Sequence, residues 1–137
     1  MSRLRRAFAT GLRVRALRRL YRIYLQEKTP QARGLRLLRS WLTPRQRAEF
    51  DSEGQFEVVG SDSGKRYRIS YGTSANVHEV DRAGRLGAGL CFMPEGGLVA
   101  GDVMLAQKIA LETCEKSTLA LANRFPPLLF SSRRGQG

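Results

Sequence analysis

An apolar strand that runs into one long helix is the feature that most constrains how this chain can fold. The strand around Leu90 leads through a Pro- and Gly-rich bend, residues 94–101, to a helical pattern over residues 103–123 that Asp102 is placed to cap. The apolar arc of this helix consists of Val103, Ala106, Ile109, Ala110, Cys114, Ala120 and Leu121. Many of these side chains are small, so we expect the helix to lie close on a sheet, with Ile109 on the face that meets it.

Upstream of that helix, residues 56–92 show the period of two that is typical of strands. Four alternating runs are separated by turns, which lie at Ser61–Gly64, Gly72–Ser74 and Asp81–Gly84. One register keeps all the apolar residues on one face, and it pairs Phe56 with Ile69, Ile69 with Val77, and Val77 with Leu90. The predicted fold class is therefore α+β, a four-stranded antiparallel meander with the long C-terminal helix packed on one face, preceded by basic amphipathic helices.

Two amphipathic segments, at about residues 3–25 and 33–42, precede the sheet. The apolar side of the first is formed in its second half by Val14, Leu17, Tyr21, Tyr24 and Leu25. The apolar side of the second is formed by Leu35, Leu38, Trp41 and Leu42. Thr43, Pro44 and Gln46 then provide a capping box for a helix that runs to about Ser52, with Gly54 just past its end.

Charge is distributed unevenly along the chain. Residues 1–40 hold twelve basic residues and one acidic residue, a net charge of +11, whereas residues 41–137 hold twelve basic and eleven acidic residues, a net charge of +1. We therefore divide the chain into a basic helical arm (residues 1–40), a compact α+β domain (41–125) and a tail (126–137) that we expect to be disordered. A basic arm on a nearly neutral domain indicates a polyanionic partner.

The arm is the strongest functional signal. Eleven of its twelve basic residues are Arg, which suits bidentate phosphate contacts better than Lys does. We predict a non-enzymatic binding protein whose arm contacts nucleic-acid phosphates without sequence readout. The predicted contact residues are Arg5, Arg6, Arg13, Arg15, Arg18, Arg19, Arg22, Arg36 and Arg39. The alternative is a protein-interaction or assembly subunit that docks the arm on an acidic partner or on an anionic membrane surface.

A resemblance adds to the prediction for the domain. The run from Lys65 through Glu112 contains KRYRI, NV, LCFMPEGGLVAGD and MLAQKIALE. These motifs resemble a family of small uncharacterised bacterial and phage-associated proteins, over roughly residues 41–123 and without the arm. Because that family carries no assigned activity, the resemblance implies a compact bacterial domain and assigns no functional residues.

The outer face of the predicted sheet offers an enzymatic interpretation. The register places Glu57, Arg68 and His78 in one row and Asn76 opposite Cys91, so that a Cys nucleophile with a His base is conceivable. However, His78 and Cys91 would be diagonal neighbours about 7–8 Å apart, and no third residue orients the His. We therefore expect a polar face with a charge ladder, and no catalytic residue.

Metal and cofactor chemistry are not predicted. Cys91, Cys114 and the single His fall short of four zinc ligands, so we expect buried free thiols, no metal and no cofactor. The bend at residues 95–101 precedes a helix N-terminus but lacks the Gly-Lys-Ser/Thr ending of a phosphate loop. The cysteines and the lack of a secretory pattern favour the cytoplasm, although the Arg-rich, acid-free first 26 residues also mimic an organelle transit peptide. No apolar run reaches the length of about 18 residues that a membrane span needs.

Overall fold

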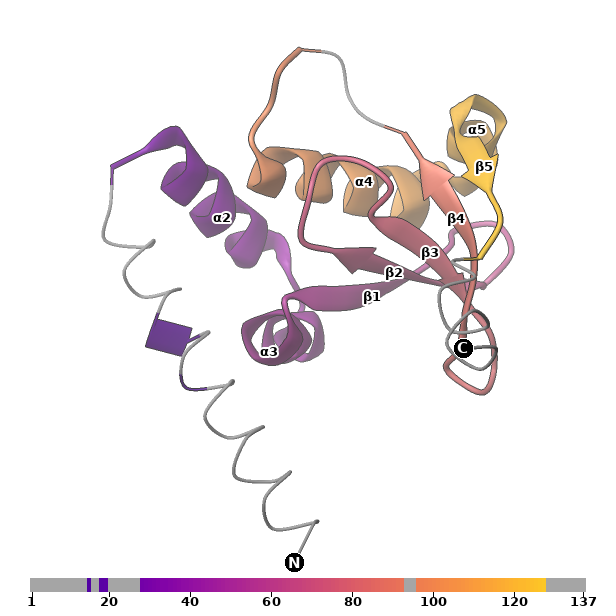
Figure 1. Ribbon diagram of the computed structural model, residues 1–137, viewed down its shortest axis with the longest axis horizontal. Coiled ribbons are helices and arrows are strands. Elements are labelled where there is room, and N and C mark those ends of the chain that lie inside the picture. The colour runs from indigo at the N-terminus through magenta and orange to yellow at the C-terminus, as the bar shows by residue number, and fades with distance from the viewer. Residues whose placement is uncertain (1–14, 16–17, 20–27, 93–95, 128–137) are drawn as a thin grey trace, which may run out of the picture.

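The fold is a five-stranded antiparallel sheet with helices on one face and at one end (Figure 1). The computed structural model describes residues 15, 18–19, 28–92 and 96–127. The helices are α2 (Pro30–Trp41), α3 (Pro44–Glu53), α4 (Ala100–Thr113) and α5 (Glu115–Leu121). The strands are β1 (Gln55–Val59), β2 (Arg66–Ser70), β3 (Val77–Val80), β4 (Leu86–Cys91) and β5 (Asn123–Phe125), and they lie in this order across the sheet. The predicted α+β class is confirmed.

One hydrophobic core joins the sheet to the helices. The sheet contributes Phe56, Val58, Tyr67, Ile69, Val77 and Leu90. The helices and the residue after α2 contribute Leu35, Leu38, Leu42, Phe50, Met104, Leu105 and Leu111. In Figure 1, α4 lies along one face of the sheet and α2 packs beside the first turns of α4. The apolar face of the sheet is therefore closed mainly by α4, with α2 covering its end.

The predicted register of the first four strands is confirmed. The observed pairs include Phe56 with Ile69, Ile69 with Val77, Val77 with Leu90, and Glu57 with Arg68. The sequence predicts these pairs correctly because a shift by one residue would expose every buried side chain on the strand. Beyond them the register shifts between His78 and Val80, and Leu86 at the start of β4 is 44% exposed instead of buried.

The sheet has a fifth strand, so the predicted four-stranded meander is one strand short. β5 follows α5 and pairs with β4, with Phe125 opposite Gly89. A Cβ atom on Gly89 would lie 2.0 Å from the ring of Phe125, so only glycine leaves room for that ring. The sequence pattern misses β5 because three residues are too few to show an alternation, and because the residue that accommodates Phe125 lies on another strand.

The predicted helix over residues 103–123 is two helices. α4 ends at Thr113, Cys114 has a non-helical backbone with φ −139° and ψ 46°, and α5 begins at Glu115. The break brings the Glu115 carboxylate to the turn between β1 and β2, where it accepts backbone hydrogen bonds. At the other end the cap residue is Val99, so Asp102 is not the cap but lies in the first turn of α4, where its charge favours the helix dipole.

The prediction that Ile109 meets the sheet is wrong, because its side chain is 39% exposed. α4 buries Met104, Gln107, Lys108 and Leu111, which lie on the opposite side of the helix. Because two of these four buried residues are polar, the hydrophobic pattern of the sequence assigns Ile109, and not their side of α4, to the core. Both polar residues have side-chain partners that make their burial acceptable.

The two helices that precede the sheet form as the sequence predicts. Thr43 Oγ1 accepts from the Gln46 amide and Gln46 Oε1 accepts from the Thr43 amide, which completes the capping box of α3. Gly54 ends that helix with a φ of 70°. In α2, Leu35 and Leu38 are buried as expected, whereas Trp41 is 58% exposed and does not belong to the core.

α2 and α4 touch through two glycines. A Cβ atom on Gly101 would lie 2.3 Å from the carbonyl carbon of Gly34, which is backbone and cannot rotate away. A Cβ atom on Gly34 would in turn lie 2.7 Å from a methyl carbon of Val99. The short distance between the two helices therefore depends on the absence of side chains at both positions. The sequence of either helix alone does not show this, because each glycine is required by a contact with the other helix.

We expect Gly101→Ala to destabilise the domain by about 1–3 kcal/mol, because the added methyl group overlaps the backbone of α2. The loss should outweigh the roughly 1 kcal/mol that alanine contributes to a helix relative to glycine. Urea denaturation measures the change. Gly87→Ala is the matched control, since its nearest neighbour would lie at an ordinary 3.6 Å. Equal stability of the two variants would contradict the proposed close contact.

Candidate nucleic-acid interface and polar sites of the domain

Three of the predicted arm contacts fall within the described residues and are exposed. Arg15, Arg18 and Arg19 all have helical backbone, and their spacing places them on one side of that helix. In the described part of the chain, none of these three forms an ion pair with an acidic residue. Four further predicted contacts, Arg5, Arg6, Arg13 and Arg22, lie outside the described residues.

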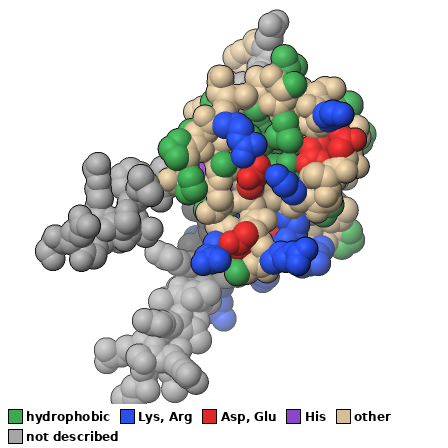
Figure 2. Space-filling model, turned by 90° about the vertical axis from the view of Figure 1, so that its right-hand side faces the viewer, with side chains coloured by type: hydrophobic (Ala, Val, Ile, Leu, Met, Phe, Trp, Pro, Cys, Tyr) green, Lys and Arg blue, Asp and Glu red, His purple; other side chains and the backbone are tan. Residues whose placement is uncertain are grey.

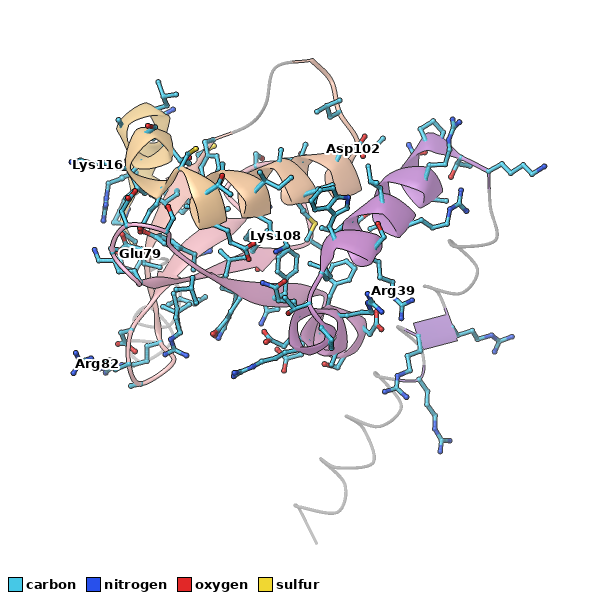
Figure 3. All side chains as sticks on the ribbon, turned by 180° about the vertical axis from the view of Figure 1, so that it is seen from behind. Arg39, Glu79, Arg82, Asp102, Lys108 and Lys116 are labelled. Carbon is cyan, nitrogen blue, oxygen red and sulfur yellow. The ribbon has the colours of Figure 1, made fainter. Side chains whose placement is uncertain are left out.

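The last two predicted contacts, Arg36 and Arg39, lie on α2 and are half-buried. Arg39 Nε donates to Asp51 Oδ1 at 3.2 Å and Arg39 Nη2 donates to Asp51 Oδ2 at 2.7 Å. This bidentate pair ties α2 to α3, which is a structural use of the guanidinium group. Figure 3 shows Arg39 at the α3 end of the molecule, far from Arg82 and Lys116.

Most charges of the compact domain are paired with one another. The ion pairs are Arg39 with Asp51, Arg45 with Glu49, Arg66 and Arg68 with Glu57, Arg85 with Asp81, Lys108 with Glu112, and Arg124 with Glu79. Exposed pairs of this kind contribute little stability, typically under about 1 kcal/mol each. Their main consequence is electrostatic, because they neutralise much of the charge of the domain.

On the outer face of the sheet, the predicted row of Glu57, Arg68 and His78 is present. His78 is only 7% exposed, and its ring meets the ring of Phe125 edge-on, with centroids 5.6 Å apart. Among the described residues its Nε2 atom has no hydrogen-bond partner, so neither Cys91 nor a carboxylate orients the ring through this atom. Burial lowers the pKa of His78, and the charge of Arg68 lowers it further.

Asn76, which the alternation placed on the outer face, lies on the opposite side of the sheet. Its amide exchanges two hydrogen bonds with Gln107 of α4, at 2.8 and 2.9 Å, and the Gln107 amide also donates to the carbonyl oxygen of Phe92. This buried amide pair fastens the end of β4 and the start of β3 to the helix. It therefore serves packing and is not aligned with Cys91 as a catalytic row.

Both cysteines are free, but they are less buried than predicted. Cys114 is exposed at the junction of α4 and α5, and Cys91 is half-buried. Cys91 contributes to the wall of a pocket of about 510 Å³, which is lined by Cys91, Phe92, Ala106, Gln107, Ala110, Thr118, Leu121 and Asn123. Within the described ranges, no group of three or more His, Cys, Asp or Glu side chains could hold a metal ion.

The most strongly bonded carboxylate in the described structure is one that the sequence did not single out. Glu115 is 1% exposed and accepts hydrogen bonds from the amides of Asp62 and Ser63, from Ser63 Oγ, and from Tyr67 Oη at 2.5 Å. Burial alone would raise the pKa of Glu115, but these donors outweigh it and lower the pKa to about 2. Burial, and then the Glu115 carboxylate, raise the pKa of Tyr67. The arrangement holds the turn between β1 and β2 against the start of α5.

No family model, curated protein or solved structure matches this chain. The resemblance to small bacterial and phage-associated proteins therefore remains a prediction. Among the described residues, no helix is long and apolar enough to cross a membrane.

Glu115 leads to a prediction about acid stability. Its pKa is about 2 in the folded protein and 4.5 ordinarily, so the unfolded chain binds the proton first as the pH falls. The stability from this carboxylate is complete above pH 4.5 and is lost between 4.5 and 2, by an amount on the order of 3 kcal/mol. Urea denaturation across this range should show the loss in the wild-type protein and a much smaller one in Glu115→Gln. Parallel profiles for the two proteins would contradict the assignment.

His78 predicts a second pH dependence at a higher pH. Because the folded pKa lies below the ordinary value of 6.5, the unfolded chain binds a proton more readily than the folded chain does. Stability should therefore fall as the pH drops below about 6.5. In His78→Phe this slope should be absent between pH 7 and 5. Glu115 does not contribute to the slope in that range, because its carboxyl group is largely ionised above pH 4.5 in both the folded and the unfolded chain. Denaturation midpoints of both proteins at several pH values measure this dependence. If stability depends on pH in the variant as it does in the wild-type protein, the buried imidazole of His78 is not the group that titrates.

Proposed function

We propose that this chain is a non-enzymatic binding protein whose Arg-rich N-terminal arm contacts nucleic-acid phosphates without sequence readout. The observation that carries the proposal is the exposure of Arg15, Arg18 and Arg19 on one side of a helix, without acidic partners among the described residues. A helix rises about 1.5 Å per residue, so these three cations lie within about one turn of one another. Duplex DNA carries one charge per about 1.7 Å of its axis, which such a cluster can neutralise.

The charges of the domain support the same conclusion. Several acidic side chains that could compete for the arm are bound to basic residues of the domain itself, as with Glu57 between Arg66 and Arg68. A polyanion would therefore meet the exposed Arg15, Arg18 and Arg19 beside a nearly neutral domain. Phosphate contacts carry no base information, which is why the proposal includes no sequence preference. The free thiols of Cys91 and Cys114 fit a reducing compartment, so we place this function in the cytoplasm.

The test compares two triple variants of the full-length protein. Arg15→Glu, Arg18→Glu and Arg19→Glu together reverse the exposed arm cluster. Lys65→Glu, Arg82→Glu and Lys116→Glu reverse three exposed basic residues of the domain, so the two variants change the net charge of +12 by the same amount. Figure 3 shows that Arg82 and Lys116 lie at the opposite end of the domain from Arg39 and α2. The two variants therefore distinguish an effect of where the positive charges lie from an effect of the total net charge.

Binding to labelled duplex DNA and single-stranded RNA is measured by fluorescence anisotropy over a range of salt concentrations. For the wild-type protein, log affinity should fall linearly with log salt, by about 0.9 per phosphate neutralised on the duplex. The arm variant should lose most of its affinity and flatten that slope by up to about 2.7, while the domain variant should lose much less. Two unrelated sequences should bind alike.

Two results would overturn this proposal. One is no binding to either nucleic acid at about 50 mM salt, where phosphate contacts are strong. The other is an equal loss in both triple variants, which would mean that net charge alone attracts the polyanion. Binding of the wild-type protein to anionic vesicles under the same conditions would instead support the membrane-surface alternative, in which changes to Leu17, Tyr21 and Tyr24 should be as harmful as changes to the arginines.

A further inference from the structure

The helix that follows the arm carries the only tryptophan of the chain, and the fold leaves this side chain largely outside. Trp41 lies at the end of α2 and is 58% exposed. α2 packs on the rest of the domain through small and aliphatic residues, and the buried ones are Ala32, Gly34, Leu35 and Leu38. Tryptophan is usually well buried, because its large ring contributes much contact area to a core. The domain gains little of that contribution here, so the ring of Trp41 remains accessible to a ligand.

Trp41 belongs to an exposed stripe of α2, here called the Trp41 stripe. Its members, Arg33, Leu37 and Trp41, follow one another at intervals of four residues, so they lie on the same side of the helix. All three are exposed, and Leu37 is 48% exposed. From Arg33 to Trp41 the stripe extends about 12 Å along the helix axis, at a rise of about 1.5 Å per residue. A guanidinium group and an indole ring therefore stand on one accessible surface.

The chain around the Trp41 stripe is basic. Residues 28–48 contain six basic residues and no acidic residue. Lys28 and Arg33 are exposed, and neither forms an ion pair with an acidic residue of the described ranges. Arg45 is paired with Glu49 at 3.5 Å, but its side chain is still 88% exposed. Charge complementarity therefore favours an anionic partner for this surface.

Two carboxylates approach α2 from other helices, and neither removes this preference. Asp51 of α3 is held by Arg39 in the bidentate pair described above. Asp102 of α4 lies against Gly34, on the side of α2 that is buried in the contact with α4. The Trp41 stripe is made of exposed residues, and it carries a cation and no carboxylate.

Other exposed hydrophobic side chains of the domain have different surroundings. Figure 2 shows the end of the molecule that carries α5 and β5, where acidic side chains stand beside basic ones among the hydrophobic side chains. Among the described residues, Tyr71 is the other aromatic side chain that is more than half exposed, at 55%. It lies between β2 and β3, where residues 69–77 contain no charged side chain. An exposed aromatic ring in line with an exposed arginine is thus a property of α2.

We propose that the nucleic acid bound by this chain is single-stranded, and that an unpaired base stacks on Trp41 while the neighbouring phosphates contact Arg33 and the exposed arginines of the arm. This inference rests on the proposed function and adds the class of nucleic acid. Proteins that bind single strands combine cations along the backbone with aromatic rings on which bases stack. Both faces of a base inside a duplex are already covered by its neighbours, so Trp41 discriminates between the two forms. Stacking is tolerant of sequence, which agrees with binding through phosphates.

The first measurement follows the fluorescence of Trp41 in the full-length protein at about 50 mM salt, where phosphate contacts are strong. The ligands are an oligouridine RNA, an oligothymidine DNA and a duplex DNA of equal length. Because the chain has one tryptophan, its emission reports on this ring alone. A stacked base should quench the emission, so quenching by either single strand supports the proposal, and the two single strands distinguish RNA from DNA. Single strands that bind without changing the emission overturn it.

The second measurement compares variants by fluorescence anisotropy. Trp41→Ala should weaken the binding of single strands by about tenfold or more, whereas duplex DNA should bind the variant as it binds the wild-type protein. The dependence of log affinity on log salt should keep its slope, because no phosphate contact is removed. Trp41→Phe should retain most of the affinity. Tyr71→Ala is the matched control, since it removes an equally exposed aromatic ring without cations beside it, and it should leave binding unchanged.

The outcomes separate this inference from the proposed function. If single strands bind with the expected salt dependence and Trp41→Ala binds them as the wild-type protein does, the base-stacking role of Trp41 is wrong and the arm proposal stands. An equal loss for single strands and duplex in Trp41→Ala also overturns the inference, because it would show a general effect on the surface. If neither single strands nor duplex bind, both proposals fail.

Discussion

The buried carboxylate of Glu115 is the interaction on which the C-terminal third of the structure depends. The carboxylate accepts hydrogen bonds from two backbone amides of the β1–β2 turn, from Ser63 and from Tyr67. These donors compensate for the burial of its charge, and the carboxylate reaches them only because the helix breaks at Cys114. The break redirects α5, and the direction of α5 brings β5 alongside β4. Gly60 is part of the same arrangement, because a Cβ atom there would lie 2.2 Å from the carboxylate. One side chain thus links a turn, a helix break and an edge strand.

The sequence predicted those features whose cause is local or periodic. Alternation gave the register of the first four strands, and the spacing of Thr43 and Gln46 gave the cap of α3, because in both cases the residues that decide the structure are close together or regularly spaced. It failed where the deciding residue is distant. Phe125 forms a strand because Gly89 leaves it space, and α2 approaches α4 because Gly34 and Gly101 both lack a side chain.

The buried side of α4 illustrates a second limit of pattern analysis. A hydrophobic arc predicted Ile109 as the core residue, yet the helix turns Gln107 and Lys108 inward and leaves Ile109 partly exposed. Gln107 can be buried because Asn76 offers a donor and an acceptor in the same geometry, and Lys108 because Glu112 lies one turn away. Such partners are invisible to a scale that counts every polar residue as outward. For the candidate interface, the position of Arg15, Arg18 and Arg19 on an exposed helix was predictable from spacing, whereas the use of Arg39 to bind Asp51 was not.

The distribution of charge decides where a polyanion can bind. Six acidic side chains of the domain are held in ion pairs, whereas Arg15, Arg18 and Arg19 are exposed and have no ion-pair partner among the described residues. Salt screens exposed charges strongly, and the exposed ion pairs of the domain each contribute under about 1 kcal/mol to stability. Raising the salt concentration should therefore weaken the binding of a polyanion far more than it weakens the folded domain, because the arm acts through charge and the domain is held together by its apolar core.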